Sequence, residues 1–329
     1  MLSSPDLEVQ NLKVSFSTPK GKRVAVNGIS FQLNSGETLA LVGESGCGKT
    51  VSALSILRLL QEPPAEFLSG KILFNGQDLL SINAKTLQDL RGRSISMIFQ
   101  DPMTSLNPVL TVGEQISETL IRHTTMNRQE ALQKSADLLG RVEFSSPKEK
   151  LNYYPHQLSG GMRQRVMIAM ALACAPKVLI ADEPTTALDV LIQAQILELL
   201  ENLKKETKMS ILLITHDLGV VTEIAQRILV MYAGEIVESG PTQELLENPF
   251  HPYTKGLIAS VPKLGLKNKP GARLEEISGN VPSLDQRPSG CPFHPRCAWA
   301  METCKTQNPQ LRRVETQRQV SCHLEPGSL

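Results

Sequence analysis

One glycine-rich octapeptide constrains the fold of this chain more than any other feature, and it reads Gly43-Glu44-Ser45-Gly46-Cys47-Gly48-Lys49-Thr50. It follows the apolar segment Thr38–Val42 and precedes a segment of helical period, which is the context of a phosphate-binding loop, or P-loop. The glycines let successive backbone N–H groups converge on phosphate oxygens at a helix N-terminus. We expect Lys49 to contact the β- and γ-phosphates and the Thr50 hydroxyl to bind Mg²⁺.

A second segment supplies the acidic groups that a P-loop site needs. The apolar run Val178–Ala181 ends in the carboxylates of Asp182 and Glu183. Asp182 is predicted to hold Mg²⁺, directly or through water, and Glu183 lies where a carboxylate could accept a proton from an attacking water. The alternative interpretation is an acidic turn at a strand end, and the P-loop upstream argues against it.

Apolar runs of strand length alternate with segments of helical period over residues 1–260. Runs such as Ile211–Ile214 are apolar throughout, which indicates strands buried on both faces of a parallel sheet. The predicted fold class is therefore α/β, with helices on both faces of the sheet and the more polar early strands as an antiparallel edge. The predicted strands are Leu7–Phe16, Val24–Leu33, Thr38–Val42, Gly70–Phe74, Ser94–Phe99, Val178–Ala181, Ile211–Thr215, Arg227–Tyr232 and Glu235–Glu238. The predicted helices are Lys49–Leu60, Val112–Arg122, Arg128–Gly140, Gly160–Cys174, Val190–Thr207 and Leu218–Ile224.

Composition argues against several classes of protein. A net charge of +1 disfavours nucleic-acid binding driven by bulk charge, and 4% aromatic residues leave few stacking platforms for bases. The longest apolar run, Val166–Ala175, is about half a membrane span, and no basic-then-apolar leader opens the chain. We therefore expect a soluble cytosolic protein that binds no nucleic acid.

The cysteines divide the chain unevenly. Cys47 and Cys174 are isolated, whereas the other four lie near the C-terminus, in a segment rich in proline. We therefore predict a domain boundary near residue 260, between a large regular domain, residues 1–260, and a small loop-rich domain, residues 261–329. Cys47 lies among the converging N–H groups of the P-loop, which predicts a lowered thiol pKa.

Further motifs in the large domain resemble those of one family. Leu158-Ser159-Gly160-Gly161-Met162 looks like the signature motif of ATP-binding-cassette (ABC) ATPases, which usually have Gln where Met162 stands. Gln100 resembles the Q-loop of that family, Ala187-Leu188-Asp189 its D-loop, and His216 its switch histidine. The motifs occur in the family's order, and the resemblance covers roughly residues 7–240.

The resemblance implies a mixed-sheet cassette with a helical subdomain at about residues 101–175. It also implies a head-to-tail dimer, in which ATP lies between the P-loop of one chain and the residues Ser159, Gly160 and Gly161 of the other. Glu183 would polarise the attacking water, His216 would contact the γ-phosphate, and Gln100 would sense metal and water. Asp189 would lie beside the nucleotide. Phe16 stands where the family has an aromatic that stacks on adenine, although an ordinary strand-core Phe is an equal alternative.

The spacing of Cys291, Cys297, Cys304 and Cys322 leaves the role of these residues open. Disulfides fit poorly with a cytosolic ATPase. The spacing lacks the C-x2-C knuckles common in zinc sites, and four thiolates on proline-rich loops suit a [4Fe–4S] cluster, so spacing alone leaves zinc and iron–sulfur about equal. His294 and His323 are predicted to lie outside the ligand set. His251 is predicted to be a local cap before Pro252.

The C-terminal region adds a closer resemblance. Segments His251-Pro252-Tyr253-Thr254 and Gly279-Asn280-Val281-Pro282, together with the cysteines, look like the extension of ATPase subunits of bacterial dipeptide/oligopeptide importers. In that extension such cysteines hold a [4Fe–4S] cluster. The segment Asp101–Pro108 also resembles this subfamily.

The closer resemblance implies a peripheral protein at the cytoplasmic face of the inner membrane. Its partners would be a second, homologous ATPase, more often a different chain than a copy, and two permease subunits. An external binding protein would select the substrate. Nickel, glutathione or antimicrobial peptides are alternative substrates. DNA repair and ribosome recycling, which other ABC ATPases serve, are disfavoured by the chain length and the near-neutral charge.

Overall fold

The computed structural model describes residues 4–186, 188–261 and 277–325. Contacts divide the chain into two compact units. The first comprises residues 1–7, 33–37 and 73–214, and the second comprises residues 8–32, 38–72 and 215–329.

In the first unit, three buried strands form a parallel arrangement. The order is β8 (Ser210–Thr215), β7 (Val178–Asp182) and β6 (Ile95–Ile98), with Val178 paired to both Ser210 and Ile95. Every residue of the three strands is buried. This confirms the parallel strands predicted from the apolar runs, because a strand covered on both faces needs no polar alternation.

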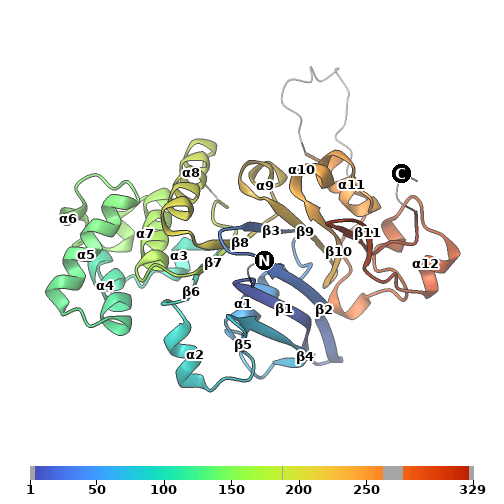
Figure 1. The fold of residues 1–329 in the computed structure, drawn as a ribbon, viewed down its shortest axis with the longest axis horizontal. Coiled ribbons are helices and arrows are strands. Elements are labelled where there is room, and N and C mark those ends of the chain that lie inside the picture. Colours follow the sequence, from blue (N-terminus) through green and yellow to red (C-terminus); the bar gives the residue numbers. More distant parts are fainter. Residues whose placement is uncertain (1–3, 187, 262–276, 326–329) are drawn as a thin grey trace, which may run out of the picture. The chain divides into compact units, whose positions relative to one another are not determined.

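Two long helices of the first unit begin at capping boxes. The Thr111 hydroxyl and the Glu114 carboxylate form a capping box at α4 (Val112–His123), and Asn127 and Glu130 form one at α5 (Arg128–Arg141). Figure 1 shows α4, α5, α6 and α7 gathered together within the predicted range 101–175. The remaining helices of this unit are α2 (Ala84–Leu90), α3 (Pro102–Ser105), α6 (Pro147–Lys150), η1 (Pro155–Gln157), α7 (Gly160–Leu172) and α8 (Val190–Thr207).

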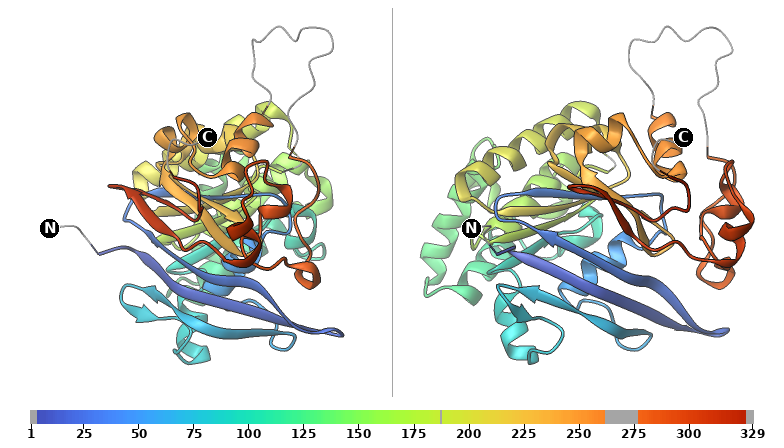
Figure 2. Two further views of the ribbon diagram at one scale, coloured as in Figure 1. Left: turned by 90° about the vertical axis from the view of Figure 1, so that its right-hand side faces the viewer. Right: turned by 45° about the vertical axis from the view of Figure 1, so that its right-hand side comes forward.

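The second unit contains a mixed sheet. Its strands follow the order β11, β12, β10, β9, β3; β3 and β9 are parallel, whereas β9, β10, β12 and β11 pair antiparallel in turn (Figure 2). The mixed-sheet α/β class is thus confirmed. The strands are β3 (Thr38–Val42), β9 (Arg227–Tyr232), β10 (Glu235–Pro241), β11 (Arg312–Glu315) and β12 (Arg318–Val320).

The early strands form a sheet of their own. Within the second unit β2 (Gly21–Leu33), β1 (Leu7–Thr18) and β4 (Ala65–Phe74) lie side by side, and in the first unit the end of β4 pairs antiparallel with β5 (Gln77–Asp78). Helices of the second unit are α1 (Lys49–Ile56), α9 (Leu218–Ile224), α10 (Thr242–Glu247), α11 (Pro252–Ala259), η2 (Leu284–Gln286), η3 (His294–Arg296) and α12 (Glu302–Thr306).

Strand β4 begins five residues earlier than predicted. Gly70, predicted as its first residue, lies inside it with φ +110°, and a Cβ there would come within 2.6–2.8 Å of backbone atoms of Leu12, Asn11 and Gln10. The glycine therefore permits a close approach of two strands instead of starting one. Helix α1 ends at Ile56 and not at Leu60, since Arg58 turns the backbone to φ +47°.

The cysteine-rich tail shares a core with the strands of the second unit. Cys291, Phe293 and Cys304 pack in one buried cluster with Val42 and Tyr232. The tail is therefore anchored by apolar contacts on the sheet, while the domain boundary near residue 260 stays a prediction.

The buried imidazole of His251 confirms the predicted helix cap. Its Nδ1 accepts the backbone N–H of Tyr253 at 3.0 Å, at the start of α11. Burial lowers the pKa of His251 from 6.5 to about 3, because a charged ring would have to leave water.

We expect His251→Asn to flatten the acid dependence of stability. Above pH 6.5 the imidazole is neutral in both states, whereas between 6.5 and about 3 only the unfolded chain binds the proton. Falling pH in that window therefore lowers the unfolding free energy by up to about 1.4 kcal/mol per pH unit. Asn keeps a capping oxygen but does not titrate. Thermal unfolding at pH 7 and pH 5 checks this, and an equal acid loss in both proteins would contradict it.

Candidate nucleotide site

The P-loop occupies the turn between β3 and α1 in the second unit, as predicted. Gly43 has φ +154°, and a Cβ on it would lie 2.2 Å from the carbonyl oxygen of Met231. Gly48 caps α1 in the left-handed region at φ +107°, where a Cβ would lie 2.9 Å from the carbonyl oxygen of Ala25. Only glycine fits either position, so packing against neighbouring strands shapes the loop.

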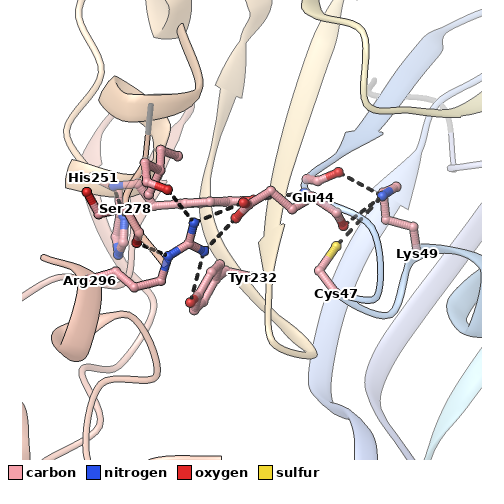
Figure 3. Close-up of polar contacts among 10 residues, drawn as sticks. Glu44, Cys47, Lys49, Tyr232, His251, Ser278 and Arg296 are labelled. Atoms are coloured by element: carbon pink, nitrogen blue, oxygen red, sulfur yellow. Dashed lines mark hydrogen bonds and ion pairs between the residues drawn. The ribbon is translucent and has the colours of Figure 1, made fainter. Parts of the chain in front are cut away.

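The side chain of Lys49 lies along the inside of the loop. Its Nζ donates to the carbonyl oxygens of Gly43 at 2.7 Å and Glu44 at 3.0 Å, and the residue is 5% exposed (Figure 3). A buried ammonium needs such partners. The same oxygens hold the positive charge of Lys49 against the loop backbone.

The expected lowering of the Cys47 pKa is wrong. Burial raises the pKa of this thiol, and the nearby Lys49 charge only partly opposes the effect. With 1% of its surface exposed, Cys47 behaves as a small packed residue.

The acidic end of β7 lies in the first unit. Asp182 is the last residue of the strand and is 1% exposed. Glu183 follows with φ +48°, and its N–H donates to the carbonyl oxygen of Ile214 on β8 at 2.8 Å. This left-handed backbone, unusual for Glu, is held by the neighbouring strand.

Two side chains orient the Glu183 carboxylate. Gln100 Nε2 and Thr186 Oγ1 both donate to its Oε2, each at 2.9 Å. The structure thus brings together two residues predicted to act on the same water. The sequence does not predict the role of Thr186, since a hydroxyl three residues after an acid has no distinctive pattern.

The signature residues form an exposed helix start in the first unit. Ser159 caps α7, accepting the N–H of Met162 at 3.3 Å. Ser159 and Gly160 are exposed, and a Cβ on Gly161 would lie 2.9 Å from Ile192 of α8. The first residues of this helix are therefore open to solvent, where an anion can bind at the helix N-terminus.

Asp189 caps α8 and is followed by two exposed aliphatic residues. Its Oδ1 accepts the N–H of Ile192 at 2.9 Å, while Val190 and Leu191 are 82% and 77% exposed. Ala187, the first residue of the predicted D-loop, lies outside the described residues.

His216 and Phe16 belong to the second unit. His216 is exposed, between the end of β8 and Asp217, which caps α9 through the N–H of Gly219 at 2.8 Å. Phe16 is half-buried on β1, and its contact with adenine stays a prediction. The P-loop shares this unit, whereas Gln100, Asp182, Glu183, the signature and Asp189 lie in the first.

The four C-terminal cysteines are free thiols close to one another. The N–H of Cys291 donates to the carbonyl oxygen of Cys304 at 2.8 Å. The pKa of Cys291 is raised to about 11, chiefly by burial and also by the negative charges that Cys304, Cys322 and Cys297 can carry.

No metal centre is confirmed in the part of the chain that the structure describes. There, no group of three or more His, Cys, Asp or Glu side chains is arranged to hold a metal ion. His294 and His323 bond instead to carbonyl oxygens of Cys291 and Gln307, both at 3.0 Å. The C-terminal metal domain predicted from the sequence is therefore not supported by this geometry.

Comparisons with known proteins identify the family. Residues 26–186 match the model described as ABC transporter, and residues 237–304 match that of the C-terminal region of oligopeptide/dipeptide transporters. The dipeptide transport ATP-binding protein DppD of Bacillus subtilis is 51% identical over 97% of this chain and 94% of its own length. The oligopeptide transport ATP-binding protein AppD of the same organism is 51% identical, over 97% and 96%. A solved dimer of the ATP-binding cassette MJ0796, bound to ADP and Pi, is 27% identical with a TM-score of 0.65, covering 72% of this chain and 98% of that one.

The fold and the motifs define a P-loop ATPase of the cassette class. The chain belongs to the ABC transporter ATP-binding proteins, of the oligopeptide/dipeptide transporter type. Within its described residues, no helix is both long and apolar enough to cross a bilayer.

Proposed function

We propose that this chain hydrolyses ATP to drive the import of dipeptides or oligopeptides through separate membrane permeases. One observation carries the proposal. A single chain holds a P-loop with an inward lysine, an oriented carboxylate at Glu183 and a solvent-facing helix N-terminus at Ser159. The relatives named for dipeptide and oligopeptide transport support the substrate class.

The residues divide the chemistry among them. The P-loop N–H groups and Lys49 would bind the phosphates. Thr50, Asp182 and the side-chain oxygen of Gln100 offer the oxygen ligands that Mg²⁺ prefers, and the bound ion would offset phosphate charge. Glu183, aimed by Gln100 and Thr186, would accept a proton from water, while His216 would contact the γ-phosphate.

Two chains would complete each nucleotide site. The exposed N-terminus of α7 would contact the γ-phosphate held by the partner's P-loop, with Asp189 beside it. Exposed Val190 and Leu191 next to Asp189 support an interface there, since large aliphatic side chains favour burial. The solved dimer of the cassette MJ0796, bound to ADP and Pi, supports the pairing of two chains. We propose a homologous but different chain as partner, two permeases above the pair at the cytoplasmic face of the inner membrane, and an external binding protein.

Nucleotide-dependent pairing tests this function. The chain, alone and with its companion ATPase, is run through size-exclusion chromatography with light scattering, with and without Mg-ATP. We expect ATP to shift the mass to that of a pair, and Lys49→Ala to abolish the shift. Reconstitution with the permeases and labelled dipeptide then tests the substrate, and uptake of nickel or glutathione instead would contradict it. If both preparations fail to pair with ATP and fail to release phosphate, the proposed function itself is overturned.

We also propose that the four C-terminal cysteines hold a [4Fe–4S] cluster. Their mutual proximity and a donor set of four thiols support this, although the same donors also suit zinc. The group would cross-link the loops of the extension. Iron and acid-labile sulfide, measured in protein purified without oxygen, test it. We expect about four of each per chain, and colourless protein with stoichiometric zinc would contradict the proposal.

A further inference from the structure

Residues from the C-terminal extension hold the second residue of the P-loop. Arg296 Nη1 and Nη2 donate to the two carboxylate oxygens of Glu44, at 2.7 and 2.9 Å, although 252 positions separate the residues (Figure 3). Two parallel N–H···O bonds from one guanidinium fix direction as well as distance.

The guanidinium is itself fixed on its other sides. Arg296 Nε donates to the carbonyl oxygen of Ser278 at 2.9 Å, and Nη2 also donates to that of Ile277 at 3.1 Å. The Arg296 side chain is 5% exposed and that of Glu44 is 30% exposed. A buried guanidinium with its donors satisfied is held more firmly than one in a surface ion pair.

A second contact fixes the backbone of Glu44. Its N–H donates to the Tyr253 hydroxyl on α11 at 2.8 Å. The ring of Tyr253 packs against Tyr232 and Phe293, with ring centres 4.6 and 5.4 Å away. Glu44 is thus held at its backbone by α11 and at its carboxylate by η3, and neither element belongs to the nucleotide motifs.

The loop carbonyl of Glu44 also receives the Lys49 ammonium. Greater mobility of the Glu44 backbone would therefore also loosen Lys49, the residue expected to contact phosphate. When a ligand has to order a loop as it binds, the ordering lowers the affinity. Contacts that order the loop before the ligand arrives remove this loss.

We propose that Arg296 is a positioning residue for ATP binding, which braces the P-loop through Glu44. The inference rests on the proposed function. It gives the C-terminal extension a direct role in nucleotide affinity, in addition to its packing on the sheet.

A double-mutant cycle tests the brace. Equilibrium binding of a fluorescent ATP analogue is measured for the full-length chain, for Arg296→Ala, Glu44→Ala and the double variant. We expect Arg296→Ala to weaken binding at least about fivefold, the lower end of coupling between sites. In the Glu44→Ala background the same substitution should have little further effect, because Arg296 acts through that carboxylate. The ATP affinity of Arg296→Lys should lie between those of the wild type and Arg296→Ala, since an ammonium cannot form two parallel hydrogen bonds to the carboxylate.

A matched control and a kinetic readout separate this role from general damage. Asp285→Asn breaks another pair that joins the extension to a strand, Arg23 Nε to Asp285 Oδ1 at 2.7 Å, and should leave ATP affinity unchanged. The loss in Arg296→Ala should appear in KM for ATP and not in kcat. Unchanged or tighter binding in folded Arg296→Ala, or additive losses in the cycle, would overturn the inference. Failure of the wild-type chain to bind nucleotide would instead refute the proposed function.

Discussion

Replacing Glu183 with glutamine should slow ATP hydrolysis by about 10²–10⁴-fold and leave ATP binding intact. The amide keeps the size of the side chain and can still bond to Thr186, but it cannot accept a proton from water. The P-loop belongs to other elements of the chain, so the phosphate contacts remain. Because ATP would be bound and not cleaved, the variant should also stay paired with its partner chain for longer than the wild type.

Phosphate release and nucleotide binding, measured on the same preparation, check this result. Glu302→Gln is the matched control, because it makes the same chemical change at a carboxylate that is 89% exposed and pairs with Lys305. That control should hydrolyse ATP at the wild-type rate. Hydrolysis at the wild-type rate in Glu183→Gln would refute the assignment of Glu183 as the general base.

Replacing Arg318 with alanine should lower the unfolding free energy by about 3–5 kcal/mol. Arg318 Nη2 donates to Glu238 Oε1 at 3.1 Å, and the two side chains are 2% and 0% exposed. The Glu238 carboxylate also accepts the N–H groups of Phe250 and His251, at 2.8 and 2.9 Å. Removing the guanidinium leaves a buried acid without its counter-charge, and burial already raises the pKa of Glu238. The Arg318 guanidinium also lies 3.7 Å from the centre of the Phe250 ring, a contact that is lost too.

Denaturant unfolding measures the effect, with Arg313→Ala as control on the neighbouring strand. Arg313 is exposed, so its loss should change stability by no more than about 0.5 kcal/mol. A second variant, Glu238→Gln with Arg318→Met, removes both charges and should recover much of the loss, because no buried charge is then left unpaired. Equal stabilities of Arg318→Ala and Arg313→Ala would show that the pair contributes nothing.

Elements defined by local patterns were predicted closely. Strands Thr38–Val42 and Arg227–Tyr232 and helices Val190–Thr207 and Leu218–Ile224 have the predicted bounds. Helix caps and the period of apolar residues depend on residues close together in the chain, so they can be recognised in the sequence without the tertiary structure. Short elements such as α2 and β12 were missed, because seven or three residues carry too little periodicity.

The residues of the nucleotide site also divide into those that the sequence predicts and those that it does not. The P-loop, the acidic pair and the signature follow from residue types at fixed spacing, and the structure places each on its expected element. The neighbours of these residues do not follow from spacing. Thr186 on Glu183, Tyr253 and Arg296 on Glu44, and the burial that raises the Cys47 pKa became visible only in three dimensions.

The order of residues by itself determined that this chain folds as an α/β P-loop cassette of the peptide-transporter type, since backbone conformation and phosphate chemistry depend on neighbours along the chain. Tertiary structure alone decided that the C-terminal extension reaches the P-loop and that Glu238 is neutralised by Arg318. The Arg296–Glu44 contact spans 252 positions of the sequence, and the Arg318–Glu238 contact spans 80. Burial sets the strength of both contacts, and it is a property of the packed molecule.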